Sequence, residues 1–292
     1  MKALNENNTI LIIGGDSRQL YMSDYLESQG FETKIYGLPE IRRACVKDLR
    51  SAASESRIVV LPLPVTKNEK SVYSVSVLKE SLEDIISAIG GDKIVFGGML
   101  SRSTEAKLKK NSNKVYDYFK REDVTAMNAV PTVQGIIKII TENIEYTVHS
   151  SRISVFGYGR IGKLAAQVLS SFGADVTVCV RKSGDLAAAR VCGYSSCAIN
   201  EFEKIADRFD IIVNTVPAQI INKSVLSKLR PDCLIVDVAS APFGTDFAAA
   251  YELGLKALQC PSLPGKVAPK TAGEIIAKGI INTLREEELL ND

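Results

Sequence analysis

The sequence predicts an α/β protein with two doubly wound, parallel-sheet domains joined by long helices. Short runs rich in β-branched residues alternate with longer amphipathic segments along the whole chain, which is typical of parallel α/β sheets. The length of 292 residues suggests about two domains. Two long segments with apolar residues at helical spacing, one central and one near the end, supply the joints.

Each half of the chain is expected to hold five strands. In the first half the strands are expected at 9–13, 33–36, 58–61, 93–96 and 124–127, and the helices at 17–29, 79–89 and 104–110. In the second half the strands are expected at 152–156, 175–180, 211–214, 233–238 and 255–259, and the helices at 160–171, 185–191, 224–229 and 246–252.

The two joining helices are expected at residues 131–145 and 271–290. Thr271 and Glu274 have the spacing of a capping box at the start of the second one. Because this helix follows the final strand directly, it can return to the first domain. The expected domains are residues 1–128 plus 271–292 and, inserted between them, residues 129–270. Open α/β sheets bind ligands at the carboxyl ends of their strands, so a cleft is expected between the domains.

The composition is that of a soluble cytoplasmic enzyme. Lys plus Arg is 36 against 34 for Asp plus Glu, so the charge balance predicts neither nucleic acid nor an anionic membrane as a partner. No apolar run reaches the roughly 18 residues of a membrane span, and the polar N-terminus lacks a signal-peptide core. The cysteines form no C-x-x-C pair and are expected to be reduced. No metal site is expected, because His149 is the only histidine and a histidine-rich site is thereby excluded. A catalytic role for His149 is the less favoured alternative, because it lies at the amino edge of its sheet, away from the ligand-binding edge.

The most informative segment is the glycine motif GYGRIG at residues 157–162. It follows an apolar strand and opens an alanine-rich helix, which is the context of a dinucleotide-binding turn. Gly157 permits the turn, Gly159 lets the backbone approach a pyrophosphate, and Gly162 lets the helix pack closely. The residues expected to bind the cofactor here are Gly157, Tyr158, Gly159, Arg160, Ile161 and Gly162. The alternative is a glycine-rich turn with no ligand.

The end of the next strand indicates which dinucleotide binds. An NAD site usually has Asp or Glu about 20 residues after the glycines, to hold the ribose 2′-hydroxyl. This chain has Arg181, Lys182 and Ser183 there, with no carboxylate to repel a phosphate. Two cations and a hydroxyl suit the 2′-phosphate of NADP. The alternative is that Arg181 and Lys182 belong to an ordinary solvated loop.

Two further strand ends of the second domain are expected to face the cofactor. One carries Asn214, Thr215, Val216 and Pro217, and the next carries Asp237, Ala239 and Ser240. Small or amide side chains at these positions suit ribose and nicotinamide contacts.

The first domain offers candidate anion-binding residues at its own strand ends. Arg18 follows Gly15, Asp16 and Ser17 in the first turn of a helix, where the macrodipole disfavours a cation. Asp16 can pair with it, or its guanidinium can bind a substrate carboxylate. Gly98 and Ser101 occupy a similar strand end. A second anion site is expected where Lys266 and Lys270 precede the helix start at Thr271. Ordinary solvent exposure is the alternative for both lysines.

Several segments, in order, resemble the A subunit family of dipicolinate synthase, the sporulation enzyme of spore-forming bacteria. They are 14–19 (GGDSRQ), 128–135 (NAVPTVQG), 146–149 (YTVH), 157–162 (GYGRIG), 239–247 (ASAPFGTDF) and 264–273 (PGKVAPKTAG). Nearly the whole chain is covered. Ser17 stands where the family pattern has Ala.

The resemblance implies a concrete activity. The family, with a separate B subunit, makes pyridine-2,6-dicarboxylate from 4-hydroxy-tetrahydrodipicolinate or its dehydrated form, and a nicotinamide cofactor takes the hydride. It also implies Rossmann-like domains similar to those of formate and glycerate dehydrogenases, and a location in the mother-cell cytoplasm. A homo-oligomer is compatible with the sequence.

For catalysis, Arg18 is expected to bind a carboxylate, and Asp16 is the weakly favoured base, with water as the alternative. Two rival functions are another NADP-dependent dehydrogenase of this fold and a non-catalytic NADP-binding regulatory subunit.

Overall fold

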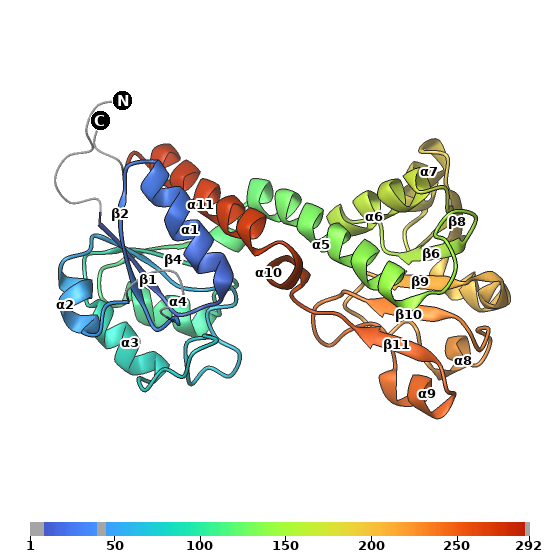
Figure 1. The fold of residues 1–292 in the computed structure, drawn as a ribbon, viewed down its shortest axis with the longest axis horizontal. Helices are drawn as coiled ribbons and strands as arrows, with labels where there is room; N and C mark the ends of the chain where they lie inside the picture. Colours follow the sequence, from blue (N-terminus) through green and yellow to red (C-terminus); the bar gives the residue numbers. More distant parts are fainter. Residues whose placement is uncertain (1–8, 40–44, 290–292) are drawn as a thin grey trace. The chain divides into compact units, whose positions relative to one another are not determined.

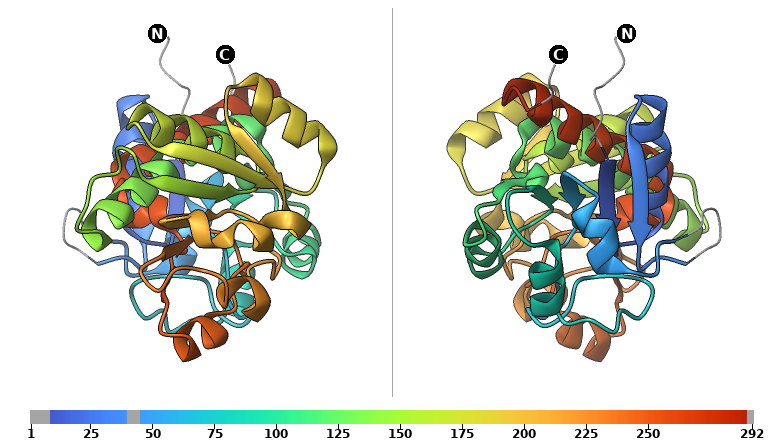
Figure 2. Two further views of the ribbon diagram at one scale, coloured as in Figure 1. Left: turned by 90° about the vertical axis from the view of Figure 1, so that its right-hand side faces the viewer. Right: turned by 90° about the vertical axis from the view of Figure 1, so that its left-hand side faces the viewer.

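A computed structural model describes residues 9–39 and 45–289 of the chain. The chain divides into two compact units, which are residues 1–128 with 268–292 and residues 129–267. The second boundary lies at residue 267, where the sequence predicts 270. Each unit is an α/β domain with helices on both faces of a parallel sheet, so the predicted fold class is confirmed (Figures 1 and 2). No helix among the described residues is both long and apolar enough to cross a bilayer.

The first unit contains a five-stranded parallel sheet in the order β2-β1-β3-β4-β5. The strands are β1 (Thr9–Ile13), β2 (Glu32–Tyr36), β3 (Ile58–Val60), β4 (Ile94–Gly97) and β5 (Lys114–Asp117). On one face lie α1 (Ser17–Ser28) and α11 (Pro269–Glu286). On the other lie α2 (Leu49–Ser54), α3 (Leu82–Ile89) and α4 (Arg102–Lys109). Ile10 and Ile12 point to the first face and Leu11 and Ile13 to the second, so β1 is buried on both sides.

The second unit contains a six-stranded parallel sheet in the order β11-β10-β9-β6-β7-β8. The strands are β6 (Arg152–Phe156), β7 (Asp175–Val180), β8 (Ser195–Ala198), β9 (Ile211–Asn214), β10 (Leu234–Asp237) and β11 (Lys256–Gln259). One face is covered by α6 (Arg160–Ser171), α7 (Ser183–Val191), α10 (Leu263–Val267) and part of α5 (Glu122–Asn143). The other is covered by α8 (Lys223–Leu226), α9 (Phe247–Glu252) and the 3-10 segments Ile199–Lys204 and Ala206–Arg208.

Two sequence predictions about secondary structure are wrong. The strand expected at 124–127 is part of α5, whose first turn carries Glu122 and Asp123 and is therefore favoured by the helix dipole. The fifth strand of the first sheet is β5. The start of the second joining helix is also misplaced, because the residues before Thr271 form α10 and the beginning of α11. That helix begins at Pro269, after Ala268, which gives no side-chain cap, so the expected capping box at Thr271 is not at its end.

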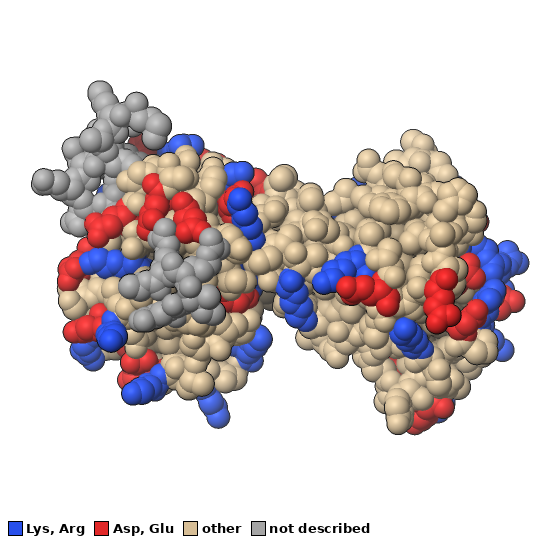
Figure 3. Space-filling model, viewed as in Figure 1, with Lys and Arg blue, Asp and Glu red and all other residues tan. Residues whose placement is uncertain are grey.

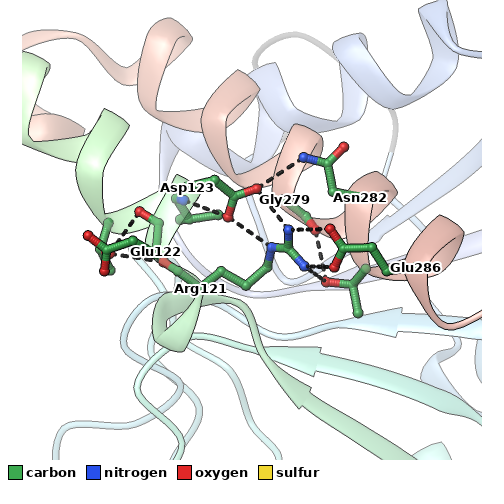
Figure 4. Close-up of polar contacts among 9 residues, drawn as sticks. Arg121, Glu122, Asp123, Gly279, Asn282 and Glu286 are labelled. Carbon is green, nitrogen blue, oxygen red and sulfur yellow. Dashed lines mark hydrogen bonds and ion pairs between the residues drawn. The ribbon is translucent and has the colours of Figure 1, made fainter.

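An ion network fastens the start of α5 to α11 within the first unit (Figure 4). Arg121 pairs with Asp123 at 2.9 Å and with Glu286 at 2.5 Å, and Asn282 donates to Asp123 at 3.0 Å. A Cβ on Gly279 would lie 2.2 Å from Val124, so the two helices approach closely here. On the face shown in Figure 3, acidic and basic side chains are interspersed, in keeping with the nearly balanced charge of the chain.

Candidate functional site

The glycine motif joins β6 to α6, and glycine is needed at each of its three positions for a different structural reason. Gly157 has a φ of +94°, and a Cβ there would lie 2.4 Å from Thr215 Oγ1. A Cβ on Gly162 would lie 2.2 Å from the carbonyl oxygen of Gly157. Around Gly159 a Cβ would meet nothing within 4 Å. Two glycines therefore serve the tight turn and the helix packing, while the third leaves an open approach to the backbone.

The helix after this turn begins without a side-chain cap. Gly159 is the N-cap residue, and the first helical hydrogen bond to it comes from Lys163 N at 2.9 Å. Within the described part of the chain, the N–H groups of Ile161 and Gly162 have no acceptor. Uncapped N–H groups and the positive end of a twelve-residue helix together favour an anion at this position.

A cavity of about 650 Å³ opens beside the glycine motif. Its lining residues are Gly157, Tyr158, Val180, Arg181, Lys182, Asp185, Ile199, Asn200, Val216, Pro217, Ala218 and Ile220. Aliphatic side chains from three strand ends dominate this lining, and flat aromatic ligands such as adenine favour such walls. Six expected cofactor residues meet here, namely Gly157, Tyr158, Arg181, Lys182, Val216 and Pro217.

Charged groups of both signs lie on the cavity wall. Arg181 and Lys182 are exposed at the end of β7, and Ser183 opens α7, which has no side-chain cap. Asp185, in the first turn of the same helix, also lines the cavity. The sequence analysis predicts no carboxylate beside the two cations, and the position of Asp185 corrects that prediction. The signal was available, because Asp185 is only three residues from Lys182.

Asn214 and Asp237 serve the protein rather than an exposed binding surface. Both are fully buried, and Asn214 Nδ2 donates to Asp237 Oδ1 at 2.9 Å. Asp237 also accepts hydrogen bonds from the backbone of Ala239, Gly244 and Thr245 and from the Thr245 hydroxyl. The polar atoms of Asn214 and Asp237 therefore organise the loop after β10, and the expected direct contact with the cofactor stays a prediction.

Two neighbouring candidates, Thr215 and Ala239, also make hydrogen bonds inside the protein. The Thr215 hydroxyl donates to the carbonyl of Phe156 at 2.7 Å, and buried Ala239 gives its N–H to Asp237. Ser240 is exposed and remains open to solvent. Thr215 and Ala239 thus shape the strand ends, whereas Val216 and Pro217 face the cavity.

In the first unit, Arg18 is buried and paired with Asp16. Arg18 Nε and Nη2 donate to the two carboxylate oxygens of Asp16 at 2.9 and 2.8 Å, and Nη2 also donates to the carbonyl of Leu63 at 2.7 Å. Burial opposes ionisation of Asp16, but the hydrogen bonds and charge of Arg18 outweigh it, so the pKa of Asp16 is lowered. Asp16 is therefore a poor proton acceptor. Nη1 of Arg18 has no partner among the described residues.

Three other candidates of this unit make contacts inside the protein, and their expected role as direct substrate contacts stays a prediction. Gly15 N donates to the carbonyl of Tyr73 at 2.7 Å. Gly98 is buried, and a Cβ there would lie 2.7 Å from Leu63 and 2.8 Å from Tyr118. Ser101 caps α4 and donates to Glu69 at 3.1 Å. Ser17 keeps an unoccupied hydroxyl at the start of α1, within the described part of the chain.

Tyr73 is a further candidate residue for the site around Asp16, and the sequence analysis does not identify it. Its hydroxyl lies 3.5 Å from Asp16 Oδ2, and the ammonium of Lys67 lies 4.0 Å from its ring centroid. The loop that carries both residues has no motif that could have revealed this contact.

The starts of α1 and α11 lie side by side in the first unit. A Cβ on Gly273 would lie 2.3 Å from the carbonyl oxygen of Arg18 and 2.9 Å from Met22 N. The positive ends of both helices therefore gather in one place. Lys270 and Thr271, in the first turn of α11, are exposed there. Lys266 is exposed on α10 of the second unit.

Neither His149 nor any of the cysteines lines the cavity beside the glycine motif. His149 is exposed, and its Nδ1 lies 2.8 Å from the Ser150 hydroxyl, before β6 begins. Cys45, Cys179, Cys192, Cys197, Cys233 and Cys260 are all free thiols. Within residues 9–39 and 45–289 there is no cluster of three potential metal ligands.

Two family models match the chain in succession. The N-terminal domain of the dipicolinate synthase A subunit matches residues 9–119, and the NAD binding domain of D-isomer specific 2-hydroxyacid dehydrogenases matches residues 134–249. The A subunit of dipicolinate synthase from Bacillus subtilis (strain 168) is 34% identical over 286 residues, which cover 95% of this chain and 96% of that protein.

Solved structures agree with this match. The A chain of dipicolinate synthase from Bacillus subtilis superposes with a TM-score of 0.87 at 32% identity and covers 100% of both chains. The corresponding A subunit from Bacillus halodurans gives a TM-score of 0.86 at 28% identity, over 96% of this chain and 98% of that one. A transhydrogenase from Sinorhizobium meliloti, at 15% identity and a TM-score of 0.70, shares the fold.

Proposed function

This chain belongs to the A subunit family of dipicolinate synthase, and we propose that it oxidises dihydrodipicolinate, formed from 4-hydroxy-tetrahydrodipicolinate, to pyridine-2,6-dicarboxylate with NADP. A nicotinamide cofactor and an oxidoreductase role follow from the matched NAD binding domain. The observation that carries the substrate proposal is the pairing of the two helix starts at Arg18 and Gly273.

The glycine motif fits the pyrophosphate of the dinucleotide. Gly159 leaves the backbone open, and the N–H groups of Ile161 and Gly162 lack acceptors in the described structure. The aliphatic cavity beside them suits the adenine ring. The bound cofactor supplies the hydride acceptor, and this chain's residues bind and orient it.

The end of β7 supports a preference for NADP over NAD. Arg181, Lys182 and the Ser183 hydroxyl stand where a ribose 2′-phosphate would be expected. Helix α7 begins without a side-chain cap, so the N–H groups of Ser183 and Gly184 add to the positive potential. A Cβ on Gly184 would meet nothing within 4 Å, which leaves room for a phosphate.

The first unit suits a dicarboxylate. Nη1 of Arg18 and the Ser17 hydroxyl, both without partners among the described residues, offer hydrogen bonds to one carboxylate. The first turn of α11, with Lys270 and Thr271, offers a positive helix end to the other. Both helix starts belong to one rigid packing contact, so they would orient a planar ring between fixed charges.

The proton lost on aromatisation goes to water in this proposal. Asp16 holds Arg18 in place and has a lowered pKa, which makes it a positioning residue. Aromatisation itself drives the reaction, so orientation is the main contribution of the protein.

The family name implies a second subunit, so the proposal includes the B subunit of the enzyme as partner and the mother-cell cytoplasm as location. The test is turnover with dihydrodipicolinate generated in place, NADP, and purified chain with and without the B subunit. NADPH and dipicolinate should form in equal amounts. If NADPH binds but neither product forms even with the B subunit, this chain is a regulatory subunit instead.

A further inference from the structure

One acidic side chain on the wall of the cofactor cavity, that of Asp185, forms no ion pair with the two cations nearby. Asp185 is half-buried on the cavity wall, and its backbone N–H is held by the carbonyl of Lys182 at 3.1 Å. Its carboxylate makes no ion pair or hydrogen bond with any described residue. Arg181 and Lys182 also make none within the described ranges. The carboxylate is therefore available to a ligand.

Asp185 occupies a place that a phosphate would also favour. It lies in the first turn of α7, where the helix dipole stabilises an anion. The uncapped N–H groups of Ser183 and Gly184 and the two cations attract a 2′-phosphate to the same end of the helix. A phosphate bound there would share one partly enclosed cavity with Asp185, so salt would screen the repulsion between the two anions only partly.

We propose that Asp185 is a specificity-determining residue, which weakens the binding of NADP(H) and accepts a hydrogen bond from a ribose hydroxyl of NAD(H). This rests on the proposed function in one respect, that the cavity binds the adenosine half of a nicotinamide dinucleotide. The preference for NADP(H) set by Arg181 and Lys182 is then reduced, and the site admits both cofactors. Asp185 differs from the acid of ordinary NAD sites, because it lies on the helix and the strand end carries Arg181.

The test is the Asp185→Asn substitution, which removes the charge and keeps the size. Dissociation constants for NADPH, NADH, 2′,5′-ADP and 5′-AMP are measured by calorimetry on the full chain. The ratio of NADH to NADPH dissociation constants should rise about tenfold, the effect of one charge interaction of about 1.4 kcal/mol. The two adenosine fragments should shift in the same sense, because they differ chiefly in the 2′-phosphate.

Asp175→Asn is the matched control. Asp175 is an exposed aspartate at the start of β7, at the opposite edge of the same sheet, so its loss changes the net charge equally. This control should change the ratio less than twofold. The inference is overturned if Asp185→Asn changes the ratio of dissociation constants no more than the control does, or if it strengthens the binding of both nucleotides equally.

A second variant and the wild-type ratio complete the design. Asp185→Ser keeps a short polar side chain in the helix first turn and should reproduce the shift if the Asn variant folds poorly. The wild-type preference tests the proposed NADP specificity, whereas the change in ratio tests Asp185. A wild type that prefers NADH, with a ratio that still rises in Asp185→Asn, would reject the first and support the second.

Discussion

Gly273 of α11 packs directly on Arg18 of α1, with space for no side chain between them. A Cβ at position 273 would lie 2.3 Å from the Arg18 carbonyl oxygen, a distance that real Cβ atoms do not show. The close approach brings the amino ends of two helices together, although the residues lie at opposite ends of the chain. The proposed dicarboxylate site depends on this contact.

Gly273→Ala should therefore weaken substrate binding as well as stability. The added methyl group must separate the helix starts, and such overpacking costs about 1–3 kcal/mol. We expect a lower Tm and a KM for dihydrodipicolinate that rises several-fold. Gly279→Ala is the control, because its Cβ would meet Val124 at 2.2 Å in a packed contact away from the helix starts. It should lower Tm similarly and leave KM unchanged; a KM that rises equally in both variants would contradict the proposed site.

Replacing Arg18 should have two separable effects. Arg18→Ala leaves the largely buried Asp16 without its partner, and breaking such a pair costs about 3 kcal/mol or more. Arg18→Ala combined with Asp16→Ala should recover part of that stability, because no unpaired charge is left, but turnover should remain lost. Arg18→Lys should restore activity only partly, since an ammonium lacks the bidentate fork. Full turnover in the double variant would show that Arg18 has a structural role alone.

Asp237 should be essential for the fold of the second unit. Asp237→Asn puts an amide in place of an oxygen that faces N–H donors of Gly244 and Thr245. Leaving those buried donors without acceptors should lower the free energy of unfolding by about 3 kcal/mol. Urea unfolding measures this loss, with exposed Ser240→Ala as a control that should be nearly neutral. Normal stability with lost NADPH affinity would instead assign Asp237 a direct contact.

The fold could be predicted well where burial on both sides leaves an uninterrupted apolar pattern. The bounds of β1, β6, β7, β9 and α6 agree with the sequence prediction. Strand β5 was missed because Lys114 and Asp117 enclose only two residues with strand propensity. Strand β8, with Ser195 and Ser196, gives an equally weak signal.

The candidate site was predictable only where a short segment carries the geometry. The glycines at 157, 159 and 162 act within one turn, and Arg181 follows its strand directly. In contrast, the donors around Asp237 come from the end of β9 and from the loop after β10, and the contact between Gly273 and Arg18 joins helices distant in sequence. Single-sequence patterns do not reveal which polar group already has a partner, so the hydrogen bonds of Asn214 and Asp237 inside the protein could not be predicted.

The network of Arg121 and Asp123 should make stability depend on acid pH. Hydrogen bonding from Arg121 is the main cause that lowers the pKa of Asp123 to about 2 in the folded chain, against about 3.9 when unfolded. The stabilisation is therefore complete above about pH 4 and is lost as the pH falls towards 2. Because Asp123 is partly exposed, the contribution of this pair to the free energy of unfolding should stay below about 1 kcal/mol. The free energies of unfolding of the wild type and of Asp123→Asn are compared across this pH range. A difference between the two that persists at pH 2 would contradict this assignment.

Arg181→Asp should reverse the cofactor preference. The new carboxylate would repel the 2′-phosphate of NADPH and accept a hydrogen bond from the free ribose hydroxyl of NADH. We expect NADPH affinity to fall at least about tenfold, the cost of about 1.4 kcal/mol, while NADH binds as well as before or better. Arg208→Asp makes the same charge change at an exposed site outside the cavity and should leave the preference intact. Calorimetric titration of both nucleotides decides the matter, because equal or tighter binding of NADH by the wild-type chain would rule out NADP specificity whatever the variants do.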